Sequence, residues 1–194
     1  RILALTATPI LCHKYCIHNS KRVMTLYGVS PAYFLSLFGE AFTAYDVARG
    51  LDLLGRLGYD GFQLEVFRPE TLETWTGEGG RVVRSAADRL GLRSEVFVGH
   101  FLLEAFVDEK SLASDFGPEE LGRCLLALEP FPECSVVSLP LPPFVTGGPV
   151  GLESYRPLEA LFREKILRMV DLIRGSGRRP AFELMPGCFL GGME

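Results

Sequence analysis

The chain has 194 residues, of which 47% are hydrophobic and 23% are charged, and its formal net charge is −4. This is the composition of an ordinary globular domain, and its acidic balance offers no basic surface for a phosphate backbone, so nucleic acid is not an expected partner. No apolar run reaches the ~18–20 residues of a membrane-spanning helix, so no membrane association is expected. Five scattered cysteines favour reduced thiols in a cytoplasmic protein over a disulfide framework.

The first 23 residues differ from the rest of the chain, because they show neither helical nor strand periodicity. Cys12, Cys16 and His18 are residue types that ligate zinc, but their spacing is uncommon and no second pair follows nearby. We therefore expect residues 1–23 to form an extension outside the fold, with the domain beginning at Met24.

From Met24 onward, strand-like apolar segments alternate with amphipathic helical segments. Thr43 and Asp46 have the spacing of a capping box at the start of a helix, and Gly58 and Gly91 stand where helices commonly end. The periodicities predict strands at 25–30, 62–67, 96–100, 135–139 and 181–184, and helices at 43–57, 82–90, 117–128 and 154–173.

An aromatic segment follows the first predicted strand. Tyr33, Phe34, Phe38 and Phe42 fall within residues 31–42, which we expect to form a loop. These rings either line a pocket or pack into the core, and the sequence leaves both alternatives open.

Strands that alternate with helices every ~30–45 residues predict an α/β fold, a parallel (β/α) barrel of the TIM type. A complete barrel typically takes ~250 residues, so residues 24–194 correspond to about five of its eight β/α units. We expect the N-terminal portion of a single barrel domain, in which strands 25–30 and 181–184 form unpaired edges that favour aggregation.

Three polar side chains stand where predicted strands end: Glu65, His100 and Glu183. The carboxyl ends of barrel strands carry the chemistry in enzymes of this architecture. Alternation along the second strand sends Gln63 and Glu65 to one side and its apolar residues to the other. Glu183, flanked by apolar residues, could hold a divalent metal or remove a proton next to a carbonyl. The structural alternatives are a rim carboxylate paired with a cation for Glu183, a loop hydrogen-bond partner for Glu65 and a buried structural histidine for His100.

The segments Gly58–Glu65 and Phe182–Gly187, together with the strand that ends at His100, resemble the xylose isomerase-like barrel superfamily. The resemblance covers about Met24 to Gly187 and implies a metal-dependent sugar or sugar-phosphate isomerase or epimerase that works through an enediolate. It implies that Glu183 is a metal ligand and an acid/base, and that Glu65 and His100 bind substrate. The implied cofactor is a divalent metal (Mn, Mg, Co or Zn).

This sequence also departs from that family. The remaining metal ligands and a second catalytic glutamate lie on later strands of the family, beyond the strands present here, so this stretch alone is expected to be inactive. The endonuclease branch of the superfamily has a histidine at the end of the fourth strand, where this chain reads Val-Val-Ser-Leu-Pro. An apurinic endonuclease-like phosphodiesterase is therefore disfavoured.

A small-molecule sugar or sugar phosphate is the expected partner, and a homo-oligomer stays open. The main alternative is a non-catalytic barrel that binds a polyol or a partner protein, because fold alone does not determine function.

Overall fold

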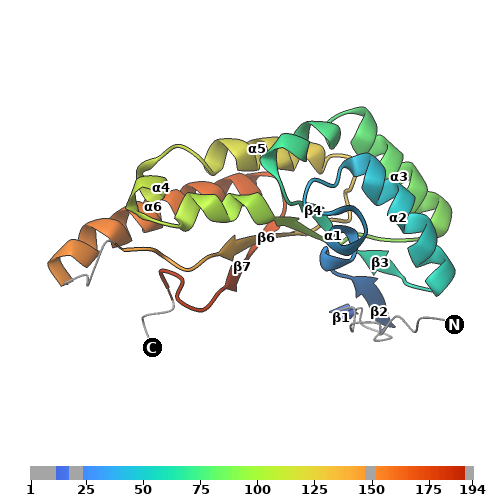
Figure 1. The fold of residues 1–194 in the computed structure, drawn as a ribbon, viewed down its shortest axis with the longest axis horizontal. Coiled ribbons are helices and arrows are strands. Elements are labelled where there is room, and N and C mark those ends of the chain that lie inside the picture. Colours follow the sequence, from blue (N-terminus) through green and yellow to red (C-terminus); the bar gives the residue numbers. More distant parts are fainter. Residues whose placement is uncertain (1–11, 18–23, 147–151, 191–194) are drawn as a thin grey trace, which may run out of the picture.

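The computed structural model describes residues 12–17, 24–146 and 152–190 (Figure 1). Its strands are β1 (Cys12–Ile17), β2 (Met24–Val29), β3 (Gly61–Phe62), β4 (Leu64–Val66), β5 (Val96–Gly99), β6 (Val136–Leu141) and β7 (Arg179–Leu184). Its α-helices are α1 (Ala32–Phe38), α2 (Ala44–Leu57), α3 (Glu78–Leu90), α4 (Glu109–Ala113), α5 (Pro118–Ala127) and α6 (Leu152–Gly175), and two 3-10 helices are η1 (Pro69–Thr74) and η2 (His100–Phe106).

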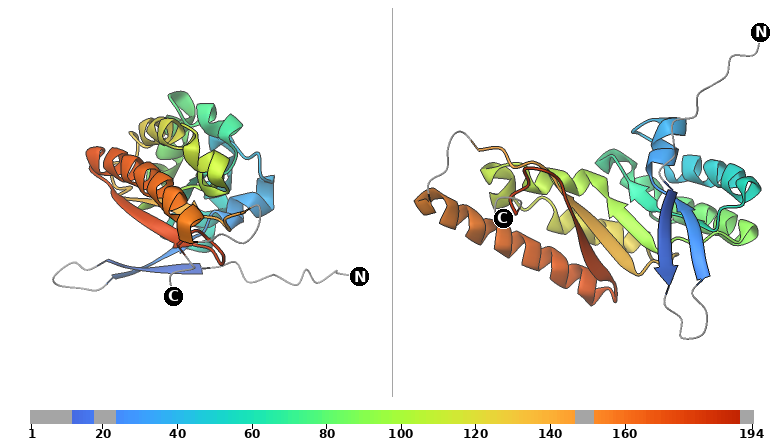
Figure 2. Two further views of the ribbon diagram at one scale, coloured as in Figure 1. Left: turned by 90° about the vertical axis from the view of Figure 1, so that its left-hand side faces the viewer. Right: turned by 90° about the horizontal axis from the view of Figure 1, so that it is seen from below.

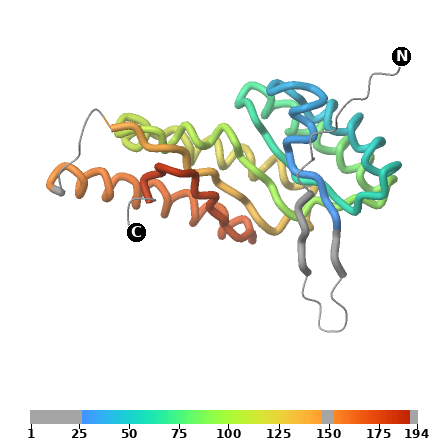
Figure 3. Tube along the Cα trace, turned by 60° about the horizontal axis from the view of Figure 1, so that its bottom comes forward, coloured from blue at the N-terminus to red at the C-terminus, as the bar shows by residue number. Residues whose placement is uncertain are grey.

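The strands form two sheets, in the orders β1-β2-β3 and β4-β5-β6-β7, and from β2 onward the paired strands run parallel. Figure 3 traces the path of the chain through both sheets. β3 and β4 are two parts of one strand, separated at Gln63. The first part pairs with β2 and the second with β5. The helices lie on one side of the strands (Figures 1 and 2). The predicted α/β fold of parallel strands is confirmed, and the sheet does not close into a ring, as expected for an incomplete barrel.

Local sequence signals set the helix ends as predicted. The amide of Asp46 donates to the hydroxyl of Thr43 at 3.3 Å, and the amide of Thr43 donates to the Asp46 carboxylate at 2.9 Å. This reciprocal capping box begins α2. Gly58 ends α2 with a φ of 77°, a left-handed conformation that glycine adopts without steric penalty.

The aromatic segment differs from the expected loop, because residues 32–38 form helix α1. Tyr33, Phe34 and Phe42 are buried, and the ring of Phe34 contacts the rings of Phe42 and Phe62. Of the two alternatives for these rings, core packing is therefore the one observed. Residues 31–42 lack a helical periodicity, but burial of these aromatic side chains stabilises the helix. Pro31 stands at its N-terminal end, a position where proline is well tolerated.

Strand β1 lies in the segment that was expected to fall outside the fold. It pairs antiparallel with β2, in a register that places Cys12 opposite Val29. The predicted free edge at the first barrel strand is consequently covered, whereas β7 has no further strand on its outer side within the described residues. His18 and residues 1–11 lie outside the described part of the chain, and the boundary at Met24 stays a prediction.

The two faces of the sheet differ in what they contact. Phe97, Val137 and Leu139 point toward the helices and are buried in the core. Val98 and Ser138, which occupy the other face, are only partly buried. This second face corresponds to the interior of a barrel, and it is where polar groups can meet a ligand. None of the described helices combines the length and the apolar character needed to cross a membrane.

Candidate functional site

Strand register places Glu65 and Glu183 on the same, helix-free face of the sheet. Glu65 pairs with Val98, Val98 with Ser138, and Ser138 with Ala181. Glu183 lies two residues beyond Ala181, so its side chain points to the same face, one layer nearer the carboxyl ends. The neighbours of Glu65 in β4, Leu64 and Val66, point into the core, which confirms the predicted alternation.

Glu65 is a buried carboxyl group, only 4% exposed. Its Oε2 atom has no hydrogen-bond partner among the described residues. Burial, and secondarily the negative charge of Glu183, raise the pKa of Glu65 to about 8. At neutral pH this carboxyl group therefore carries its proton and can donate a hydrogen bond.

His100 is the first residue after β5 and lies beside Glu65. Its Nδ1 is 3.8 Å from Glu65 Oε1, which is too long for a hydrogen bond. Burial lowers the pKa of His100, and the nearby charges of Glu183, Glu40 and Arg68 modify this effect without reversing it. The imidazole is thus neutral at neutral pH, and the contact joins two uncharged groups.

Glu183 stands on β7, in the strand conformation that was predicted, and its side chain is exposed. The negative charge of Glu183 acts on both Glu65 and His100, and it favours the protonated form of each group. The structure therefore brings the three predicted site residues to one rim, with Glu183 as the solvent-accessible carboxylate. Their roles in binding and catalysis stay predictions.

Four further residues at this rim were missed by sequence reasoning. The ring of Phe67 stacks on His100, and Arg68 forms an ion pair with Glu40. Ser30, directly after β2, is buried and its hydroxyl has no partner among the described residues. Phe67, Arg68 and Ser30 follow strand ends, so the rule that pointed to His100 could have found them. Glu40 carries no such signal, since it meets Arg68 only through tertiary folding.

The described residues do not by themselves fit a divalent metal. Nowhere among them do three or more His, Cys, Asp or Glu side chains gather as a metal-binding group. At the rim, Glu65 keeps its proton near neutral pH and Glu40 is paired with Arg68, which leaves Glu183 and the neutral imidazole of His100 as candidate ligands. Two ligands are fewer than Mg²⁺, Mn²⁺ or Zn²⁺ takes. The predicted metal role of Glu183 therefore stays a prediction.

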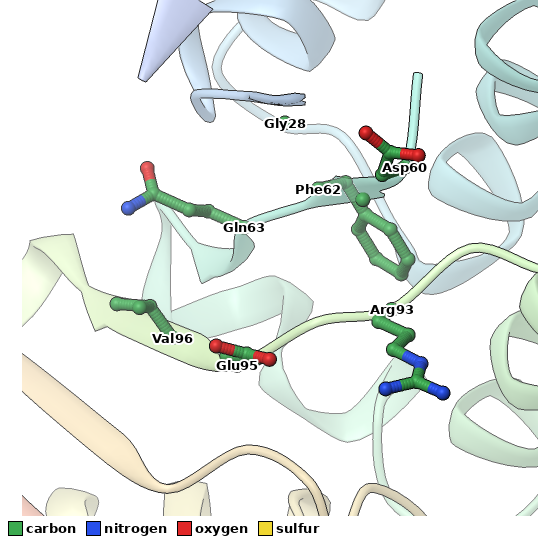
Figure 4. Close-up of a pocket in the computed structure, with 8 residues that line it drawn as sticks. Gly28, Asp60, Phe62, Gln63, Arg93, Glu95 and Val96 are labelled. Atoms are coloured by element: carbon green, nitrogen blue, oxygen red, sulfur yellow. The ribbon is translucent and has the colours of Figure 1, made fainter. Parts of the chain in front are cut away.

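A small hollow elsewhere on the sheet is distinct from this rim (Figure 4). It lies at the opposite, amino ends of β3 and β5, where Asp60, Arg93 and Glu95 are found. Figure 4 shows Phe62 and Gln63 pointing away from each other on either side of the strand. None of the three predicted site residues lines this hollow.

Among known proteins, no family model and no curated protein matches the chain. Solved structures match it. One is 3-keto-D-glucoside 4-epimerase, YcjR, from E. coli, with a TM-score of 0.49, 14% identity, and coverage of 73% of this chain and 52% of that chain. Another is D-allulose 3-epimerase from Methylomonas sp., with a TM-score of 0.49, 13% identity, and coverage of 76% of this chain and 48% of that chain.

The chain spans about half the length of both solved chains. Both names denote sugar epimerases, the class that the resemblance to the xylose isomerase-like superfamily implied. Both TM-scores lie below 0.5, so neither likeness assigns a function to this chain.

Proposed function

We propose that this chain belongs to a sugar or sugar-phosphate isomerase or epimerase that moves a proton at the carbon next to a carbonyl. The observation that carries the proposal is the placement of Glu65, His100 and Glu183 toward the carboxyl ends of the parallel strands of one sheet, β4-β5-β6-β7, on the face free of helices. Such a rim is where barrel folds place their chemistry.

The three groups differ in protonation, which suits a division of labour. Glu183 is accessible, and its negative charge acts on both neighbours, so it is the group proposed to take and return the proton. Glu65 retains its proton and can donate to a substrate oxygen. Neutral His100 can orient a hydroxyl. A buried carboxyl group whose pKa is raised, beside an accessible carboxylate, is typical of acid/base sites.

A divalent metal at Glu183 is a separate part of the proposal. It is tested by titrating the chain with Mn²⁺ and following free Mn²⁺ by electron paramagnetic resonance. Binding that is lost in Glu183→Gln and kept in Glu164→Gln, an exposed carboxylate on α6, would support the metal role. Equal binding by the two variants would overturn it.

The catalytic proposal is tested by solvent exchange. In D₂O, the product of the complete gene is incubated with D-fructose or D-fructose 6-phosphate, and deuterium at the carbon beside the carbonyl is followed by NMR. We expect incorporation that falls by about 10²-fold or more in Glu183→Gln, since acid/base groups typically contribute 10²–10⁴-fold. Exchange that is unchanged in this variant contradicts the assignment of Glu183.

A non-catalytic polyol-binding barrel is the second candidate. It is favoured by the oxygens of Ser30 and Glu65, which are buried, have no partner among the described residues and could bind the hydroxyls of a polyol. It predicts sugar binding without deuterium exchange in the experiment above. A phosphodiesterase for damaged DNA is not favoured, because two carboxylates, Glu40 and Glu183, and one cation, Arg68, act on His100 among the described residues.

A further inference from the structure

The rings of Phe67 and His100 stack at the rim of the sheet. Their centroids are 4.2 Å apart and their planes differ by 11°. The guanidinium carbon of Arg68 lies 5.8 Å from the centroid of the Phe67 ring. Arg68 is in turn ion-paired with Glu40, which belongs to the segment between α1 and α2. The imidazole therefore lies at the end of a chain of contacts that begins in another element.

Strand register explains why these two rings meet. Val66 of β4 pairs with Gly99 of β5, so the next residue of each strand, Phe67 and His100, emerges at the same level. Phe67 lies two residues beyond Glu65 and leaves the backbone on the same side. The stacked rings thus stand one layer above the buried carboxyl group of Glu65.

The stack is the main contact that can fix the plane of the imidazole. No hydrogen bond to either ring nitrogen of His100 comes from the described residues, and the Nδ1 contact with Glu65 is 3.8 Å long. The titratable and charged groups that face His100 are the protonated carboxyl group of Glu65 and the charged side chains of Glu183, Glu40 and Arg68. Charge alone does not define a ring plane, whereas a parallel aromatic contact does.

We propose that Phe67 is a positioning residue for His100: its ring, held by Arg68 and Glu40, keeps Nδ1 toward Glu65 and leaves Nε2 free for a substrate hydroxyl. The role of Nε2 in binding a substrate hydroxyl rests on the proposed function. The orientation of the His100 ring does not depend on that function, and it can be measured on the chain without a ligand.

The test uses the NMR signals of the His100 imidazole, assigned by their absence in His100→Gln. A phenyl ring stacked face to face shifts the protons of its neighbour upfield by its ring current. Phe67→Leu should abolish this upfield shift and also weaken the nuclear Overhauser effect between the imidazole protons and the side chain of Glu65, because the imidazole is no longer held toward Glu65. Phe67→Tyr, which keeps the ring, should retain both signals. Tyr155→Leu is the matched control, because it removes another parallel stack, that of Tyr155 on Phe189 at 5.1 Å.

The proposal is overturned if Phe67→Leu leaves the His100 signals in place while its circular dichroism is unchanged. It is equally overturned if Tyr155→Leu shifts them as much. Should Phe67→Leu fail to fold, the wild-type chain decides: a nuclear Overhauser effect between the two rings supports the stack, and its absence refutes it. If D-fructose and D-fructose 6-phosphate leave the His100 signals of the complete gene product unmoved while the ring-current effects hold, the proposed function fails and the positioning of His100 stands.

Discussion

Glu65 shows how far a single residue can be predicted from sequence. The alternation of polar and apolar side chains in residues 62–66 correctly assigned its face of the sheet. Its protonation state was out of reach, because that state depends on burial by distant segments and on Glu183, which is 118 positions away along the chain. Local pattern determines the direction of a strand side chain, whereas a pKa is a property of the assembled environment.

We expect Glu65 to make the chain less stable as the pH rises. The ordinary pKa of glutamic acid is 4.5, and in the folded chain that of Glu65 is about 8. Between these values the unfolded state releases a proton that the folded state keeps, so the free energy of unfolding falls with increasing pH, by at most about 5 kcal/mol in total. Glu65→Gln should remove this decline and be more stable than wild type at pH 8, by roughly 2–5 kcal/mol.

The measurement is urea unfolding of both proteins at pH 5 and pH 8. His100 contributes in the opposite sense, because its lowered pKa destabilises the fold below pH 6.5, but both proteins retain it. The difference between them therefore isolates Glu65. Parallel pH dependences in the two proteins would show that Glu65 is ionised in the folded state.

At the scale of elements, predictability followed the strength of the local signal. Helix α2 has a capping box, an apolar stripe and a terminal glycine, and it forms where it was predicted. Helix α1 and strand β1 lack such periodicity. Helix α1 forms because its aromatic side chains are buried in the core, and β1 forms by pairing with β2. Their formation is a tertiary effect, which a pattern within one segment does not reveal.

Thr43→Ala should destabilise the chain by about 1 kcal/mol, within the ~0.5–2 kcal/mol range for loss of a helix N-cap. The variant loses the hydroxyl that accepts from the Asp46 amide. Thr76→Ala is the matched control, since that exposed hydroxyl donates to the carbonyl of Glu73 and does not cap a helix start. Chemical unfolding of the three proteins gives the two differences. A loss for Thr43→Ala no greater than for the control would mean that the capping box contributes nothing.

β7 gives a test of strand register at the same scale. If Glu183 lies one layer above Glu65, Glu183→Gln removes a negative charge and lowers the pKa of Glu65. The change should be the smaller part of the total shift, because burial is the larger cause. Carboxyl ¹³C NMR titration measures it directly. Glu164→Gln on α6 should leave the Glu65 titration unchanged, and an effect as large as that of Glu183→Gln would mean that the register is wrong.

For the whole molecule, the sequence correctly predicted an open sheet, but the prediction of two free edges was wrong at the first strand. β1 covers the edge of β2, while the outer side of β7 has no partner strand within the described residues. Phe182 and Leu184 of β7 are 38% and 56% exposed. An edge strand that combines unpaired backbone groups with exposed apolar side chains is a template for pairing with another chain.

We therefore expect the chain to self-associate through β7, and Leu184→Lys to weaken that association, because a charge on an edge strand opposes pairing. Leu57→Lys makes the same change at a side chain that is 59% exposed, but at the end of α2, where no strand edge is available. Sedimentation velocity over a range of concentrations should show dissociation for Leu184→Lys alone. If both variants associate less, general surface hydrophobicity is the cause, and if wild type is monomeric throughout, the edge of β7 is not an interface.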